Sequence, residues 1–148
     1  MKYLLALAVI LSTAAVVTLV GAAGFPQRVH YIHHDKVAAA FVKGGRVIED
    51  EGLIVIANRG VQRGSEMHDH TNHVFIIVDG EAEFITGGKM TDPKVTAPGQ
   101  TRGSGIEGGV SHRLTKGDVI TIPARTPHQW KDTSKTGSVC YYAVNYTT

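Results

Sequence analysis

The feature that most constrains the fold of this chain is a series of short, apolar, β-branched runs separated by glycine-rich turns. Runs of this kind, bounded by Gly, Pro, Asn or Asp, predict β-strands rather than helices. Many short strands in turn predict an all-β sandwich or a small barrel, and periodicity alone does not choose between the two. The predicted strands are Leu53–Ala57, His73–Val78, Glu81–Thr86, Val119–Ile122, His128–Lys131 and Val139–Tyr146.

Two segments differ from this strand pattern. His30–Gly45 predicts the one convincing helix, with Asp35 as its N-cap and the Gly44-Gly45 pair as its end. Lys89–Val110 is rich in Gly, Pro, Thr and Asp, and it predicts a long loop with at most a short strand on either side. The Asp79-Gly80 pair, which lies between two predicted strands, is typical of a β-hairpin turn.

The N-terminus has the layout of a secretory signal peptide. Lys2 supplies a positive charge, Leu4–Val20 is almost wholly apolar, and small residues follow as far as Ala23. We expect residues 1–23 to be a signal peptide cleaved after Ala22 or Ala23, residues 24–148 to form one domain, and the protein to be secreted or periplasmic. The rival interpretation is an uncleaved anchor, because the apolar run approaches the roughly 18–20 residues that span a membrane. Membrane contact is expected only through this segment.

Charge and cysteine content exclude several classes of function. The 148 residues include 15 Lys and Arg against 13 Asp and Glu, a formal net charge of +2. This balance is unlike that of a nucleic-acid-binding protein, so no nucleic-acid partner is expected. The single cysteine, Cys140, excludes an intramolecular disulfide and a thiolate zinc cluster. The eight histidines remain as candidates for metal or proton chemistry.

Most of the candidate chemistry lies in two segments. In the first, Glu66, His68 and His70 are spaced two apart, so an extended strand would project all three to one face. A turn at Thr71-Asn72 would then bring His73 back on the next strand. The second segment, Gly117–His128, offers a fourth imidazole just after an apolar strand.

These two segments resemble the paired motifs of the cupin superfamily. Gly117, Pro123 and His128 match the second motif without gaps, whereas Arg125 stands where the motif has Gly and Asp132 where it has Asn. The resemblance covers roughly Gly52–Tyr146, nearly all of the mature chain.

In the first motif, Gly60 and Gly80 have the family spacing. That register puts Glu66 at the first His of the motif, His68 at the second, and His73 at its Glu. A carboxylate and an imidazole are thus exchanged relative to the family.

A second register remains open for the first motif. It takes His68-Asp69-His70 as the His-x-His pair, with His73 in place of the Glu, but it loses the spacing from Gly60. The favoured ligand set is therefore Glu66, His68, His73 and His128, with His70 as a competing ligand.

The resemblance implies a single-domain cupin β-barrel, a jelly-roll-like double-stranded β-helix, preceded by one short helix. It also implies one divalent transition metal: three imidazoles and a carboxylate suit Fe, Mn, Zn, Ni or Cu. Small cupins of this type act on small organic molecules as dioxygenases, isomerases or lyases, and a homodimer is expected by resemblance. The alternative is a non-catalytic module that binds a small ligand or a metal.

Other residues receive weaker assignments. Glu66 and His70 are the candidates for a general base if they do not bind the metal. Arg125 and Trp130 flank His128 and are candidates for the substrate pocket, although core packing explains Trp130 equally well. Surface or otherwise non-ligating roles are expected for His30, His33, His34 and His112.

Overall fold

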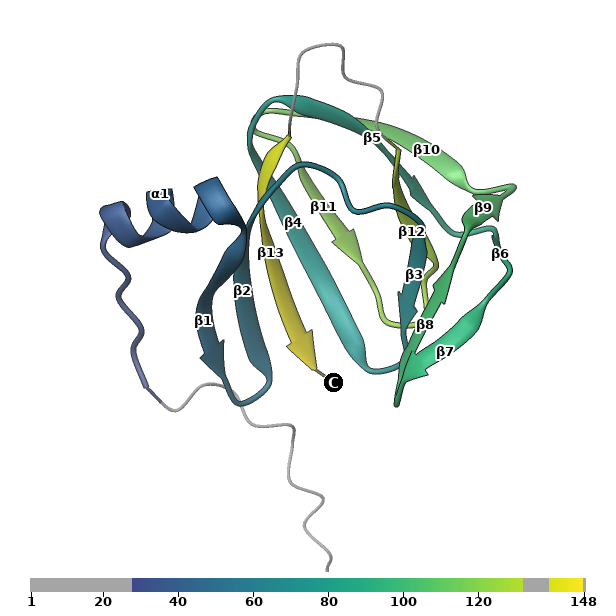
Figure 1. Cartoon of the computed structure of the whole chain (residues 1–148), viewed down its shortest axis with the longest axis horizontal. Coiled ribbons are helices and arrows are strands. Elements are labelled where there is room, and N and C mark those ends of the chain that lie inside the picture. Colours follow the sequence, from purple (N-terminus) through teal and green to yellow (C-terminus); the bar gives the residue numbers. More distant parts are fainter. Residues whose placement is uncertain (1–27, 132–138, 148) are drawn as a thin grey trace, which may run out of the picture.

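The computed structural model describes residues 28–131 and 139–147 (Figure 1). Helix α1 spans His34–Lys43 and is followed by short strands. The strands are β1 (Gly45–Asp50), β2 (Leu53–Arg59), β3 (Ser65–His68), β4 (Thr71–Asp79), β5 (Glu81–Thr86), β6 (Lys89–Thr91), β7 (Lys94–Ala97), β8 (Gln100–Gly103), β9 (Gly105–Glu107), β10 (Val110–Thr115), β11 (Val119–Ile122), β12 (His128–Lys131) and β13 (Cys140–Thr147).

The strands form two facing antiparallel sheets. One sheet has the order β1-β2-β13-β4-β11 and the other the order β10-β5-β12-β3-β8-β7, while β6 and β9 form a separate pair. In Figure 1 the two sheets lie opposite each other, and α1 lies outside the first sheet beside β1 and β2. The all-β class with one short helix is therefore confirmed.

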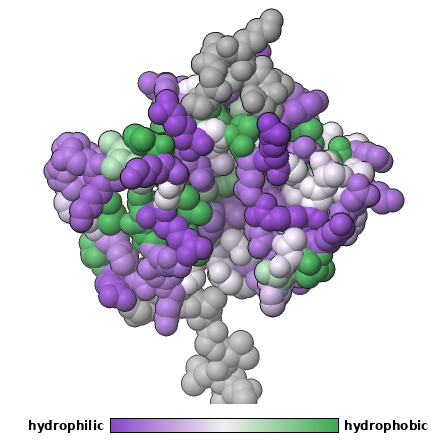
Figure 2. Space-filling model, in the orientation of Figure 1, coloured by the Kyte–Doolittle hydropathy of each residue, from purple (hydrophilic) through white to green (hydrophobic). Residues whose placement is uncertain are grey.

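The hydrophobic core lies between the sheets, because alternate residues of each strand point inward. Phe75 on β4 stacks on Trp130 of β12, with ring centroids 5.8 Å apart and planes 9° apart. Phe84 and Ile77 are almost completely buried beside them. The outer face is different: Figure 2 shows hydrophilic side chains over most of the visible surface, with smaller hydrophobic groups between them.

The helix begins after His30, where the predicted segment starts, but before Asp35, its predicted N-cap. Its N-cap is His33, whose side chain accepts a hydrogen bond from the backbone N–H of Asp35, so Asp35 lies inside the first turn and is not the cap. The expected stop is confirmed, since Gly44 adopts a positive φ of 68° at the C-cap. From Gly45 the chain continues directly into β1, a strand that the sequence did not predict.

The Asp79-Gly80 pair forms a turn but not a hairpin. β4 pairs with β13 and β11, whereas β5 pairs with β10 and β12. Gly80 alone separates the two strands, and its φ of 72° turns the chain from one sheet into the other. A two-residue hairpin turn would have kept both strands in one sheet, so this prediction was wrong.

The segment expected to be a long loop is largely strand. Lys89–Val110 contains β6, β7, β8 and β9 and leads into β10. These strands are short, and β7 is exposed along its whole length, so the segment lacks the apolar alternation that marks a buried strand. Antiparallel pairing of β8 with β3 nevertheless makes it part of the second sheet.

The signal-peptide prediction for residues 1–23 lies outside the described residues. Within residues 28–131 and 139–147, no helix has the length and apolar character needed to cross a membrane.

Candidate metal centre

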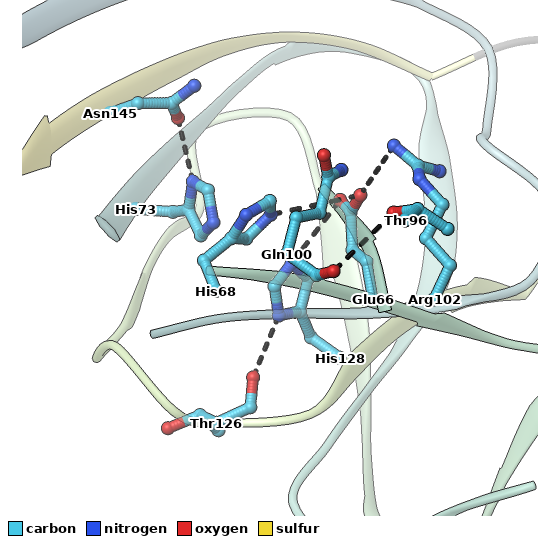
Figure 3. Close-up of polar contacts among 9 residues, drawn as sticks. All are labelled: Glu66, His68, His73, Thr96, Gln100, Arg102, Thr126, His128 and Asn145. Atoms are coloured by element: carbon cyan, nitrogen blue, oxygen red, sulfur yellow. Dashed lines mark hydrogen bonds and ion pairs between the residues drawn. The ribbon is translucent and has the colours of Figure 1, made fainter. Parts of the chain in front are cut away.

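Three histidines from both sheets converge at one end of the core. His68 is the last residue of β3, His73 lies near the start of β4, and His128 is the first residue of β12. One ring nitrogen from each of the three lies within 4.8 Å of the others. Figure 3 shows the three rings directed toward one another.

His73 is held by a neighbour on the paired strand. His73 and Asn145 are directly opposite in the β4–β13 register, and His73 Nδ1 lies 2.7 Å from Asn145 Oδ1. Because an amide oxygen only accepts, Nδ1 carries the proton and Nε2 presents a lone pair. His73 Nε2 is buried and has no hydrogen-bond partner among the described residues.

His128 is oriented in the same way by the backbone. Its Nδ1 donates to the carbonyl oxygen of Thr126 at 2.9 Å, which leaves the Nε2 lone pair free. The His128 side chain is 2 % exposed, and no described atom hydrogen-bonds its Nε2. Outer contacts that fix the tautomer and ring plane of a histidine are typical of metal ligands.

Glu66 brings a carboxylate to the same point. It is opposite His128 in the β12–β3 register, and its Oε1 lies 3.4 Å from His128 Nε2. Its Oε2 lies 3.8 Å from His68 Nε2 and 3.2 Å from a guanidinium nitrogen of Arg102. Burial alone would raise the pKa of Glu66, but His128, His68 and Arg102 together hold this pKa below its ordinary value.

Burial favours the neutral form of His73 and of His68. Burial lowers the pKa of His73 from 6.5 to about 4, and burial is also the main cause that lowers the pKa of His68. At neutral pH His73 and His68 are therefore neutral, and the Glu66 carboxylate beside them is ionised. Electron-rich atoms that converge without a proton between them fit a cation, and neutral imidazole is the form that binds metals.

The turn before β12 joins the elements that carry the ligands. The backbone N–H of Arg125 donates to the His68 carbonyl at 2.7 Å, and that of Ala124 donates to Asn72 Oδ1 at 2.9 Å. Arg125 has a φ of 64°, a left-handed conformation that glycine adopts most easily. This backbone requirement accounts for the glycine of the cupin motif at the position where this chain has arginine.

A cavity of about 700 Å³ opens beside the candidate ligands. Glu66, His68 and His73 line it, together with polar groups such as Asn145 and Arg102. The remaining walls are partly apolar and include Leu53, Ile54, Ile56 and Phe75. A small organic molecule can therefore reach the cluster of ligands.

The other predicted site residues lie elsewhere. β3 ends at His68, so His70 does not share the face of Glu66 and His68; it is exposed in the bend before β4. Arg125 is exposed and Trp130 is part of the aromatic core, and neither is among the described residues that line the cavity.

The four remaining histidines lie away from the centre. Exposed His33 and His34 each pair with Asp35, His30 contacts Asp50, and His112 contacts Thr86. The ligand-type atoms of His33, His34 and Asp35 also lie within 4.8 Å of one another, but all three residues are exposed.

Two residues that contact the candidate ligands, Asn145 and Arg102, were not predicted from the sequence. Asn145 points inward from β13, where its neighbours are mostly apolar or aromatic. A polar side chain at such a position could have indicated from the sequence that it contacts another polar group in the interior. Arg102 lies in the segment that was expected to be a loop, so only the strand pairing reveals its place opposite Glu66.

No protein-family model and no curated protein sequence matches the chain. Several solved structures are similar to the chain. A double-stranded β-helix domain protein from Klebsiella pneumoniae aligns with a TM-score of 0.51 and 17% identity, over 69% of this chain and 73% of that one. The chain has the cupin fold.

Two further similar structures are of longer chains. Fe(II) HppE aligns with a TM-score of 0.52 and 15% identity, over 70% of this chain and 50% of that one. Hydroxypropylphosphonic acid epoxidase from S. wedmorenis aligns with a TM-score of 0.51 and 16% identity, over 68% of this chain and 48% of that one. The chain thus spans about half the length of these proteins, and the likeness establishes the cupin fold alone.

We expect the metal-free protein to lose stability as the pH falls from about 6.5 toward 4. Folded His73 resists protonation until its pKa of about 4, whereas in the unfolded chain it takes up a proton near pH 6.5. The unfolded state then binds more protons, so stability that is complete above pH 6.5 declines by on the order of 3 kcal/mol at pH 4. Burial of His68 acts in the same direction.

Urea unfolding in the presence of a chelator, measured at several pH values, tests this expectation. His73→Gln is the matched variant, because it keeps a polar side chain that does not titrate. Its stability should decline less steeply with falling pH than that of the wild type. Equal slopes for the two proteins would contradict the assignment of this titration to His73.

Proposed function

We propose that this protein is a small exported cupin that holds one divalent transition metal and acts on a small organic molecule in the adjoining cavity. One observation carries the proposal: the Nε2 atoms of His73 and His128 are buried, lack a hydrogen-bond partner among the described residues, and face His68 and Glu66. Burying such polar atoms is costly unless something binds them. A metal ion satisfies all of them together.

The donor set limits the identity of the metal. Three imidazole nitrogens and one carboxylate oxygen suit Fe(II), Mn(II), Ni(II), Cu(II) or Zn(II). Such a metal supplies Lewis-acid polarisation of a bound substrate oxygen or, if it is iron, reactivity with dioxygen. The similar HppE structures are described with Fe(II) and with Co(II), which supports a metal of this class.

The protein's own groups set the chemistry of the cavity. Asn145 and the Thr126 carbonyl orient the histidines, and the apolar wall limits water around the ligands. Glu66 lines the cavity and is held ionised, which fits its place in the donor set better than the alternative role of general base. His70, the other candidate, is exposed and is not among the described residues that line the cavity.

A non-catalytic binding module is the second candidate function. It is favoured by the ion pair of Glu66 with Arg102, which engages the carboxylate that lies beside His68 and His128. With that carboxylate engaged, the centre can bind a metal and a small ligand without a free general base.

Both candidate functions include a bound metal, and metal analysis tests this shared feature. We expect the wild-type protein to bind one equivalent of a divalent transition metal and to gain thermal stability from it. His128→Ala should lower the metal affinity more than about 100-fold, beyond the range typical for loss of an outer contact. Elemental analysis of the protein purified from its native compartment, followed by competition titration, measures both quantities.

His112→Ala is the matched control, because this histidine is partly buried and hydrogen-bonded to Thr86 but lies outside the cluster. Its metal affinity should equal that of the wild type. A wild-type protein that takes up no stoichiometric metal would refute the proposed centre.

Turnover separates the enzyme from the binding module. If the protein is an oxygenase, the Fe(II)-loaded wild type should consume oxygen with at least one member of a panel of diols and 1,3-diketones. An oxygen electrode, with product analysis by mass spectrometry, measures the reaction. Glu66→Gln should reduce the rate, because it removes the charged carboxylate from the cavity. Ligand-induced thermal shifts without any product would favour the binding module.

The proposal of export is based on residues 1–23, which lie outside the described residues. The positive charge, apolar run and small residues of positions 1–23 support cleavage after Ala22 or Ala23. Protein recovered from the exported fraction should therefore have an intact mass that lacks residues 1–22 or 1–23. A full-length mass in the membrane fraction would instead support the anchor. The homodimer implied by the resemblance stays a prediction, which light scattering on the purified protein measures.

A further inference from the structure

Glu66 and Arg102 belong to one row of side chains across the second sheet. The strand registers place His128 opposite Glu66, and Glu66 opposite Arg102, on three adjacent strands. Residues directly opposite in antiparallel strands have side chains on the same face at close range. The backbone itself therefore sets Glu66 between a histidine of the centre and a guanidinium group.

The two oxygens of Glu66 point to different partners. Oε1 lies 3.4 Å from His128 Nε2, whereas Oε2 lies 3.2 Å from a guanidinium nitrogen of Arg102 and farther, 3.8 Å, from His68 Nε2. Figure 3 shows Glu66 between the histidines and Arg102. The guanidinium group is charged at every physiological pH and only donates hydrogen bonds. It therefore competes with any second cation for the Oε2 lone pairs.

Arg102 is in turn fixed by two amides. When each amide is turned so that its oxygen faces the guanidinium group, Gln62 accepts from both terminal nitrogens and Gln100 accepts from one terminal nitrogen and Nε, at 3.0 and 3.2 Å. Gln100 lies opposite His68 in the adjacent row of the sheet. In this orientation of the amides all three guanidinium nitrogens have acceptors, which favours the position of the Arg102 side chain beside Glu66.

We infer that Arg102 is a positioning residue that holds Oε2 of Glu66 and leaves only Oε1 to bind the metal. The inference rests on the proposed metal centre, which it deepens. A carboxylate can bind a metal through one oxygen or through both, and each additional protein oxygen occupies a position that a substrate would otherwise take. Arg102 thereby keeps a coordination position open toward the cavity, where a small molecule with oxygen ligands can bind.

The test compares the zinc-loaded wild type with R102M and R102K, by crystal structure and by infrared difference spectra of protein labelled with ¹³C-glutamate. The splitting between the two carboxylate stretching bands is larger for one bound oxygen than for two, and Glu66→Gln identifies the bands of Glu66. We expect one Glu66 oxygen on zinc in the wild type and the other on Arg102. In R102M both oxygens should bind zinc and the splitting should fall, whereas R102K should retain most of the wild-type splitting.

Lys94→Met is the matched control. Lys94 lies next in the same row, opposite Arg102, and is exposed, so this variant removes one positive charge without touching Glu66. Its splitting should equal that of the wild type. Two Glu66 oxygens on zinc in the wild type, or an R102M spectrum identical to the wild-type one, would overturn the inference. If R102M does not fold, the wild-type crystal structure still tests the inference, because a zinc-bound Glu66 whose second oxygen does not contact Arg102 would overturn it. A wild type that binds no zinc would instead refute the metal centre.

Discussion

Inward-facing side chains pack between the two sheets, and this packing sets the positions of the candidate ligands. Because side chains alternate along a strand, β4 places Phe75 two residues after His73, and β12 places Trp130 two residues after His128. The aromatic rings meet across the gap and form a dry floor, with Phe75 5.5 Å from His73 between ring centroids. Burial against this floor favours the neutral form of the His73 imidazole and removes water from the Nε2 atoms of His73 and His128.

The same arrangement makes the candidate centre a link between the sheets. His73 and Asn145 come from the first sheet, whereas His68, Glu66 and His128 come from the second. Without a cation, the His73 ring packs edge-on against the rings of His68 and His128, but the lone pairs of His73 and His128 Nε2 have no hydrogen-bond partner among the described residues. A bound cation is attracted to both sheets and binds only when both are in place, so metal binding stabilises the folded state. The rigid strands define the ligand positions more closely than loops would.

The sequence predicted those features that local patterns encode and missed those that depend on pairing between distant segments. The apolar runs identified β2, β4, β5, β11, β12 and β13, and the glycine spacings brought together His68, His73, His128 and Glu66. The strands of Lys89–Val110 were missed because their stability comes from pairing and not from buried alternation. Arg102 was missed for the same reason, since its partner is 36 positions away and is known only from the register. β3 ends at His68, so His70 does not share the face of Glu66 and His68. The ends of strands are the element boundaries that a sequence predicts least well.

The exchange of a carboxylate and an imidazole relative to the cupin motif has a physical consequence in this fold. Position 73 is 5 % exposed and lies on the aromatic floor, where an ionised carboxylate would lose its hydration. A neutral imidazole can be buried at this position, because Asn145 Oδ1 accepts a hydrogen bond from its Nδ1. Position 66 is wetter, with a side chain 19 % exposed beside the cavity, and it has a guanidinium group on the adjacent strand to balance a negative charge. The charged ligand therefore occupies the position where its charge is compensated, and the neutral ligand occupies the dry one. The exchange and Arg102 are best understood together, since a carboxylate moved to β3 without its partner on β8 would carry an uncompensated charge into a half-buried site.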